Sequence, residues 1–221
     1  MTQLLLIRHG KTDWVGDRLA GLTPGIPLNE VGRAEAVALA ARLSDTQIAA
    51  VYASPVDRAR ETAEYVAVPR GLEVTILPGV REVDFGAWTG RKLADLRKEA
   101  LWRTVQGQPS AMRFPDGERL IDAQSRALAA LEEVRAAHPW DTVAVVSHAD
   151  VIKALVAHFA GTHFDLFQRI AIDTASVSVV HFTPEGTSVV LVNDTGRMPA
   201  PPKAPEPAPD PAATPTDAEK E

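Results

Sequence analysis

Short runs of leucine and β-branched residues alternate along the chain with longer stretches in which apolar residues recur at helical spacing. Such runs, bounded by polar turns, are typical of strands buried in a parallel sheet, and the longer stretches are typical of helices packed on it. The strand-like runs are residues 4–7, 50–53, 73–77, 142–147 and 176–182, and the helix-like stretches are residues 30–43, 56–66, 119–137 and 150–160. This alternation predicts an α/β fold of three layers, with a mostly parallel central sheet flanked by helices.

The C-terminal part of the chain contains two segments with different sequence patterns. Phe182 is followed by Thr-Pro-Glu-Gly-Thr and a second apolar run at residues 189–192, which predicts a hairpin closing one sheet edge. From residue 198 onward the chain contains dense proline and almost no large apolar residue, so it has little to bury against the entropy of ordering. We expect one folded domain over residues 1–197 and a disordered, Pro/Ala-rich acidic tail over residues 198–221.

Composition excludes several classes of protein. A chain of 221 residues, 45% hydrophobic, can bury one substantial core, and the absence of cysteine rules out disulfides and thiolate chemistry. The apolar run after Met1 has no basic leader and stops at Arg8, far short of a membrane span, so we expect a cytoplasmic protein without a membrane partner. The net charge of -6 argues against a nucleic-acid partner.

The segment between Gly90 and Gly117 is locally basic and weakly periodic. Its cations are Arg91, Lys92, Arg97, Lys98, Arg103 and Arg113, against the acids Asp95, Glu99 and Asp116. A helical lid insertion over an anionic substrate would have this composition, because positive potential raises the encounter rate with phosphates. A solvated helical face would have it too, and the sequence leaves both interpretations open.

Phosphate-compatible side chains follow three of the predicted strands. The first strand runs into Arg8-His9-Gly10, the second into a helix that carries Arg58, and the fourth into His148. Open α/β sheets bind ligands at the carboxyl ends of their strands, and a helix N-terminus there favours an anion. Taken alone, a histidine at such a place is more often structural than catalytic, and Arg58 or Arg60 would be expected to form a surface ion pair.

Four spaced motifs identify a resemblance. They are Arg8-His9-Gly10, Ser54-Pro55-x-x-Arg58-Ala59-x-x-Thr62-Ala63, Arg81-Glu82-x-x-Phe85-Gly86-x-Trp88-x-Gly90 and Ser147-His148. In this order, over about residues 1–195, the chain resembles the phosphoglycerate mutase-like branch of the histidine phosphatase superfamily, and within it a bacterial subgroup labelled as phosphomutases. The resemblance implies a catalytic domain that needs no metal and no cofactor and acts on a small phosphorylated molecule.

The resemblance also implies roles for individual residues. His9 would attack phosphorus to give a phosphohistidine, while Arg8, Arg58 and His148 surround the transferring group and offset its charge. Glu82 would protonate the leaving oxygen and then deprotonate the attacking water, which requires a pKa raised toward the working pH. We expect a backbone carbonyl from the loop after His9 to hold its other ring nitrogen, so that the imidazole is neutral.

The environment of Glu82 has two interpretations in the sequence. Phe85 and Trp88 would desolvate the carboxyl group and raise its pKa, whereas Arg81 would hold it ionised in a surface pair. The motif match favours the first.

Two positions depart from the family pattern. Val15 stands where many members have an asparagine that contacts phosphate, so that contact is missing or supplied elsewhere, with Thr12 as a candidate. Ala149-Asp150 stands where Gly-Gly is common, and we place Ala149 in the substrate site. The Asp150 carboxylate would either select a substrate with a hydroxyl or amine or, as we expect, cap the helix.

Four functions compete. A phosphatase of small metabolites is favoured over a phosphomutase because the segment between Gly90 and Gly117 is short for a mutase lid. A metal-dependent hydrolase would have only His148 and Asp150 as ligands, which is too few. A non-catalytic binding module would have lost a core motif. The histidines outside the motifs, His138, His158, His163 and His181, are expected to be structural or exposed, and an exposed edge strand would permit a homodimer.

Overall fold

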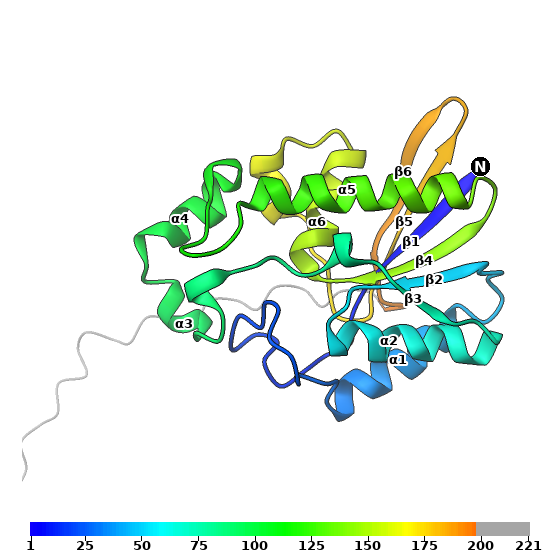
Figure 1. Ribbon diagram of the computed structural model, residues 1–221, viewed down its shortest axis with the longest axis horizontal. Helices are drawn as coiled ribbons and strands as arrows, with labels where there is room; N and C mark the ends of the chain where they lie inside the picture. The colour runs from blue at the N-terminus through cyan, green and yellow to red at the C-terminus, as the bar shows by residue number, and fades with distance from the viewer. Residues whose placement is uncertain (198–221) are drawn as a thin grey trace, which may run out of the picture.

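A computed structural model describes residues 1–197, which form one six-stranded sheet with helices on both faces (Figure 1). The prediction of a disordered tail at residues 198–221 lies outside the described residues. The strands are β1 (Thr2–Arg8), β2 (Ala50–Ala53), β3 (Val74–Ile76), β4 (Thr142–Ser147), β5 (Val177–Thr183) and β6 (Gly186–Asp194). Their order across the sheet is β3-β2-β4-β1-β5-β6.

The sheet is mostly parallel, as predicted. β1 pairs in parallel with β4, β4 with β2, and β2 with β3, while β5 runs antiparallel to both β1 and β6. The residues of β1 from Leu4 to Ile7 are no more than 3% exposed. A strand covered on both faces needs a continuous apolar run, which explains the leucine-rich start of the chain.

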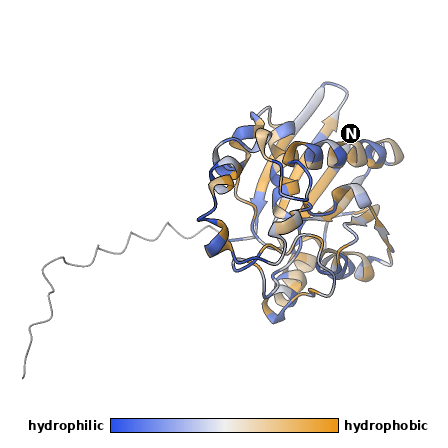
Figure 2. Ribbon diagram, turned by 60° about the vertical axis from the view of Figure 1, so that its left-hand side comes forward, coloured by the Kyte–Doolittle hydropathy of each residue, from blue (hydrophilic) through white to orange (hydrophobic). Residues whose placement is uncertain are grey.

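Four helices make the outer layers. They are α1 (Glu30–Arg42), α2 (Asp57–Ala67), α5 (Leu120–Ala137) and α6 (Ala149–Phe159). α1 and α2 cover one face of the sheet, and α5 and α6 cover the other (Figure 1). The strands between them carry mainly hydrophobic residues (Figure 2). Each of these helices is too short or too polar to cross a membrane, as are the other helices within residues 1–197.

Sequence-based boundaries hold to within two residues for these helices and for the first five strands. β6 begins three residues before the predicted run, because the hairpin turn is tight and Gly186 already pairs with Thr183. α2 begins at Asp57, with Val56 as its N-cap and Pro55 just before it.

The basic segment between Gly90 and Gly117 folds into short helical pieces. They are α3 (Leu93–Leu96), α4 (Ala100–Gly107) and the 3-10 turn η4 (Pro109–Ala111). Leu96, Val105 and Met112 anchor them in the main hydrophobic core. Arg97 is exposed, and Lys98 pairs with Asp95 at 3.0 Å. Arg97 and Lys98 therefore lie on a solvated face. The interpretation of this segment as a lid over the substrate stays a prediction.

Candidate active site

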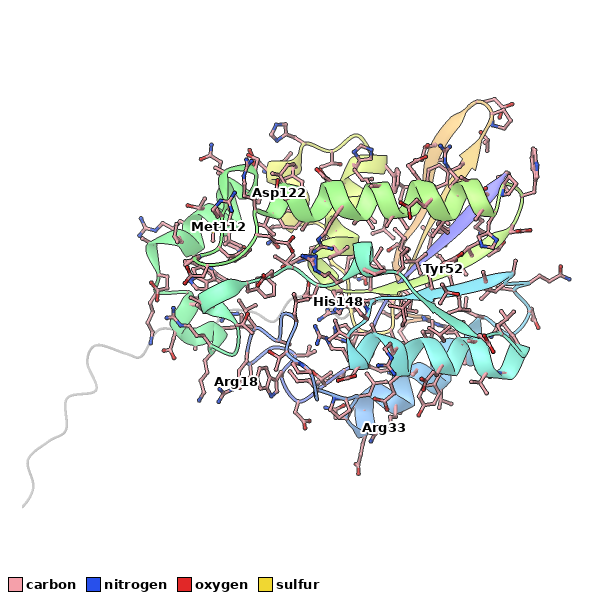
Figure 3. All side chains as sticks on the ribbon, in the orientation of Figure 1. Arg18, Arg33, Tyr52, Met112, Asp122 and His148 are labelled. Carbon is pink, nitrogen blue, oxygen red and sulfur yellow. The ribbon has the colours of Figure 1, made fainter. Side chains whose placement is uncertain are left out.

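The carboxyl ends of three neighbouring strands meet at one edge of the sheet. His9 follows β1, Ser54 follows β2 and His148 follows β4. The His9 amide donates to the Ser147 carbonyl oxygen at 3.0 Å, and the Ser54 amide donates to the Val146 carbonyl oxygen at 2.9 Å, which continues the ladder past the strand ends. His148 lies in the middle of the molecule, between the two helical layers (Figure 3).

A cavity of about 140 Å³ opens at this edge. Six of the seven residues expected in the site line it: Arg8, His9, Thr12, Arg58, Glu82 and Ala149. The seventh, His148, is fully buried and is connected to the cavity through Arg58, whose Nη2 lies 3.3 Å from His148 Nδ1. The fold therefore gathers the predicted side chains from segments that are far apart in the sequence.

His9 is held as a neutral imidazole whose unprotonated Nε2 accepts a hydrogen bond from Arg58. Its Nδ1 lies 2.7 Å from the Gly10 carbonyl oxygen, which accepts the ring proton and leaves Nε2 unprotonated. Arg58 Nε donates to Nε2 at 3.2 Å. Burial, together with the charges of Arg58 and Arg8, holds the pKa of His9 well below its usual 6.5. The ring is therefore in the form that a nucleophile requires.

His148 is neutral as well, with its proton on the opposite side. Arg58 Nη2 can only donate, so His148 Nδ1 accepts, and Nε2–H then donates to the Ser54 hydroxyl at 2.7 Å. Burial and the nearby Arg58 lower the pKa of His148 well below its usual value. The two imidazole rings meet edge to face, with centroids 5.2 Å apart.

Within residues 1–197, Arg8 and Arg58 each have a buried N–H group without an acceptor. Arg58 is 1% exposed, and its Nη2 donates to the Gly21 carbonyl oxygen at 2.8 Å, yet its Nη1 has no hydrogen-bond partner within residues 1–197. Arg8 Nη1 donates to the Ile172 carbonyl oxygen at 2.7 Å, while its Nε likewise has no partner in that range. A buried guanidinium N–H without an acceptor is costly, so an anion in the cavity would be stabilised by both arginines.

The loop after His9 is fixed against α1 and α2. The Gly10 amide donates to Thr62 Oγ1 at 3.0 Å, and the Thr62 hydroxyl donates to the Arg58 carbonyl oxygen at 2.7 Å. A Cβ on Gly10 would lie 2.6 Å from the Gly32 carbonyl oxygen, so only glycine permits this approach. Thr62 thus links the segment of His9 to the segment of Arg58, a role that its place in the motif did not reveal.

Glu82 has the environment of a proton carrier. Its side chain is 12% exposed, its Oε1 accepts from the Val83 amide at 2.9 Å, and its Oε2 lies 3.8 Å from His148 Nδ1. Burial, reinforced by the charge of Asp150, raises the pKa of Glu82 from 4.5 to about 7, against the opposing charges of Arg58 and Arg8. Phe85 lines the cavity beside Glu82.

Comparison with known proteins identifies the family. Residues 4–195 match the model of the histidine phosphatase superfamily, branch 1. The chain belongs to this superfamily. Phosphoserine phosphatase 1 of Hydrogenobacter thermophilus is 32% identical to it over 200 residues, covering 88% of this chain and 93% of that protein.

Two further relatives agree with the assignment. A Cronobacter sakazakii protein named "Probable phosphoglycerate mutase GpmB" is 30% identical over 209 residues, covering 91% of this chain and 97% of that one. The structure of YhfR from Bacillus stearothermophilus superposes with a TM-score of 0.81 at 32% identity, covering 86% of this chain and 96% of YhfR. The family resemblance and the α/β fold expected from the sequence are both confirmed.

The departures from the family pattern both lie on the cavity wall. Val15 and Thr12 line it, and Thr12 Oγ1 accepts a 3.3 Å hydrogen bond from the Trp14 amide. The expectation that Asp150 caps α6 is wrong, because the N-cap is His148 and no side chain caps the helix. Asp150 instead lies in the first turn, lines the cavity and pairs with Lys153 at 3.4 Å.

Sequence reasoning missed most of the apolar wall of the cavity. Trp14, Leu19 and Leu93 line it, and Arg18 stacks over the Trp14 ring at 5.8 Å to its centroid. Arg18 lies on the loop at the outer side of the site (Figure 3). These residues carry no motif: the turns between Thr12 and Ala20 bring Trp14 and Leu19 to the cavity, and Leu93 reaches it from the start of α3, where its amide donates to the Asp17 carbonyl oxygen at 2.7 Å.

The alternative interpretations of single residues are settled by contacts. Arg60 pairs with Asp57 at 3.7 Å, which makes it the surface arginine of α2. Arg81 Nη2 lies 3.7 Å from Glu118 Oε2, so Arg81 forms its ion pair with Glu118 and not with Glu82.

The histidines outside the motifs are absent from the cavity wall. His138 is partly buried and lies 3.0 Å from the Tyr52 hydroxyl. Within residues 1–197, no group of three or more histidine, aspartate or glutamate side chains is arranged to hold a metal ion.

Proposed function

We propose that this member of the superfamily is a phosphatase that hydrolyses small phosphomonoesters through a phosphohistidine on His9. The observation that carries the proposal is the state of His9. Its Nε2 has a lone pair, its Nδ1 proton is held by the Gly10 carbonyl oxygen, and it lies on the wall of a cavity with two arginines. The Nε2 lone pair would form a bond to phosphorus as the bond from phosphorus to the leaving oxygen breaks.

Charge stabilisation would come from the arginines. Phosphoryl transfer needs positioning and offset of charge more than covalent help from the protein. Arg58 Nη1 and Arg8 Nε, which lack partners within residues 1–197, would donate to phosphate oxygens. Thr12 and the first residue of α6, Ala149, border the same space.

His148 would donate to phosphate only after a change of tautomer. In the structure its Nδ1 accepts from Arg58 and its Nε2–H donates to Ser54. A hydroxyl group both donates and accepts, so Ser54 would donate to Nε2 once the proton has moved to Nδ1. Substrate binding that draws Arg58 onto phosphate would favour this change.

Glu82 would serve as acid and then as base. With a pKa of about 7, about half of the molecules carry this proton in neutral solution, and the protonated form gives it to the leaving oxygen. The resulting carboxylate then takes a proton from water as that water displaces Nε2 from phosphorus. The product is inorganic phosphate, and both His9 and Glu82 return to their starting forms.

The cavity favours a small substrate. Its volume is about 140 Å³, and the apolar side chains of Trp14, Leu19, Phe85 and Leu93 form part of its wall. The relative named as a phosphoserine phosphatase makes phosphoserine the first compound to test. We further propose a cytoplasmic location, and a homodimer stays a prediction.

A phosphomutase is the second candidate, favoured by the relative whose printed name is a phosphoglycerate mutase. Both reactions share the phosphohistidine and differ in whether water or a bound hydroxyl receives the phosphoryl group. Burst labelling of His9 followed by addition of a phosphoglycerate acceptor would separate them. Return of label to the acceptor faster than release of phosphate would assign the mutase.

The decisive experiment measures phosphate release from phosphoserine, phosphoglycerates, sugar phosphates and an aryl phosphate in the presence of a chelator. His9→Ala should abolish release, whereas His158→Ala, at an exposed histidine of α6, should leave it unchanged. Activity lost in the chelator would assign a metal-dependent hydrolase. An inert wild type that still binds phosphate would assign a binding module.

A further inference from the structure

Glu82 lies on backbone that has no regular secondary structure. The segment runs between the 3-10 turns η2 (Pro78–Val80) and η3 (Gly86–Trp88). Such a segment has no helix or sheet ladder to satisfy its carbonyl groups, so their partners must come from elsewhere. A proton carrier on it holds its position only if those partners fix the backbone.

One side chain of α5 supplies these partners. Arg126 Nη1 donates to the carbonyl oxygens of Gly79 at 2.7 Å and Arg81 at 2.8 Å, and Nη2 donates to that of Glu82 at 3.0 Å. The Arg126 side chain is 18% exposed. Three carbonyls around the Glu82 Cα are thus held by a single guanidinium group.

The remaining donors of Arg126 are used by Glu118. Nε donates to Glu118 Oε2 at 3.1 Å and Nη2 to Oε1 at 2.7 Å, so all five N–H groups of the guanidinium have an acceptor. Glu118 Oε1 also accepts from the Asp84 amide at 2.8 Å, and the Glu118 amide donates to the Asp84 carbonyl oxygen at 3.0 Å. The pair therefore holds the backbone on both sides of Glu82.

The close approach of this segment to α5 depends on a glycine. A Cβ on Gly79 would collide with Ala130 and would lie 2.9 Å from the Arg126 carbonyl oxygen. Neither Arg126 nor Glu118 lines the cavity. Their hydrogen bonds reach the site through the backbone that carries Glu82, and, in addition to burial, the charge of Arg126 helps to lower the pKa of His148.

We propose that Arg126 and Glu118 form a backbone clamp that positions Glu82 for proton transfer to the leaving group. The inference rests on the acid role of Glu82 in the proposed function. Arg126 and Glu118 are positioning residues, since they touch no reacting atom. A planar fork is needed because a lysine ammonium, with three donors on one nitrogen, cannot reach the five acceptors.

The test compares leaving groups. Arg126→Lys should lower kcat on an alkyl phosphate, whose leaving oxygen needs a proton, by about 10-fold to 100-fold, a part of the 10² to 10⁴ that general acids contribute. On an aryl phosphate the loss should be less than about 3-fold, with KM little changed, because Arg8 and Arg58 still bind phosphate. Arg135→Lys, at an exposed arginine of the same helix, is the matched control.

A double-mutant cycle separates positioning from general stability. In a Glu82→Gln background, Arg126→Lys should cost no further alkyl-phosphate activity. Equal losses on alkyl and aryl phosphates, or additive losses in the cycle, would overturn the clamp. If the Arg126 variant does not fold, Glu118→Gln, which keeps the shape of its side chain, is put through the same comparison and should show the same leaving-group dependence.

The outcome distinguishes this inference from the proposed function. Glu82→Gln alone should lose much more activity on alkyl phosphates than on aryl phosphates if Glu82 is the acid. If Glu82→Gln loses mainly alkyl-phosphate activity but Arg126→Lys and Glu118→Gln do not, the clamp is refuted and the proposed function stays in place. If Glu82→Gln loses activity equally on alkyl and aryl phosphates, the acid role in the proposed function is itself refuted.

Discussion

Glu82→Gln should change how the free energy of unfolding depends on pH. Burial raises the pKa of Glu82 from 4.5 to about 7 in the folded chain. The folded state therefore binds this proton more tightly than the unfolded state does. The resulting stabilisation is complete below about pH 4.5 and is lost as the pH rises through about 7.

The size of the effect follows from the two pKa values. They differ by about 2.5, which corresponds to about 3 kcal/mol between the extremes of pH. Glutamine has nearly the same shape and no charge at any of these pH values. The unfolding free energy of Glu82→Gln minus that of the wild type should therefore increase by about 2 to 3 kcal/mol between about pH 5 and about pH 8. His9 and His148 are buried in both proteins with pKa values well below 6.5, so taking the difference removes most of their contribution.

Urea unfolding measures this difference directly. The chain has four tryptophans, of which Trp88 is 3% exposed, so fluorescence should report loss of the core. Wild type, Glu82→Gln and Glu132→Gln would be unfolded at several pH values, and the last controls for loss of one exposed carboxyl group. A difference that stays flat, or one that decreases as the pH rises, would refute a buried, protonated Glu82 and with it the acid role.

Three further predictions follow from the same contacts. Turnover of an alkyl phosphate should fall as the pH rises above about 7, because Glu82 loses the proton it must donate, and a pH–rate profile of Glu82→Gln should lack this alkaline limb. Thr62→Val should destabilise the fold by about 1 to 3 kcal/mol in urea unfolding, because the buried Gly10 amide loses its acceptor, and unchanged stability would contradict that assignment. Reversing the charges of Arg97 and Lys98 should leave kcat/KM unchanged for every substrate if they form a solvated face, whereas a clear loss would favour the lid.

The sequence determined the layout of the fold. Apolar runs such as Leu4–Ile7 mark strands covered on both faces, and burial of this kind is a local property that a pattern of residues reports. The strand ends likewise pointed to His9, Arg58 and His148, because strand ends in a parallel sheet share one edge, and the family resemblance added Glu82. Their catalytic roles stay proposals.

The tertiary structure decided the chemistry of each group. Arg58 contacts His9 across 49 residues and His148 across 90, and these contacts assign the tautomers of both rings. Arg126 gives no sequence signal within α5, yet it holds carbonyls 44 to 47 residues away. Asp150 would serve as a cap by its position alone, but its charge acts on Glu82.

The physical reason for this division is the range of the forces involved. Periodicity reports which face of an element is buried, and neighbours in the chain are enough to reveal it. A pKa and a tautomer depend on which distant side chains exclude water and which donors lie within hydrogen-bond reach. The sequence therefore specified where Glu82 lies in the chain, and only the packing of α5, α6 and the first loop around it decided that it carries a proton near neutral pH.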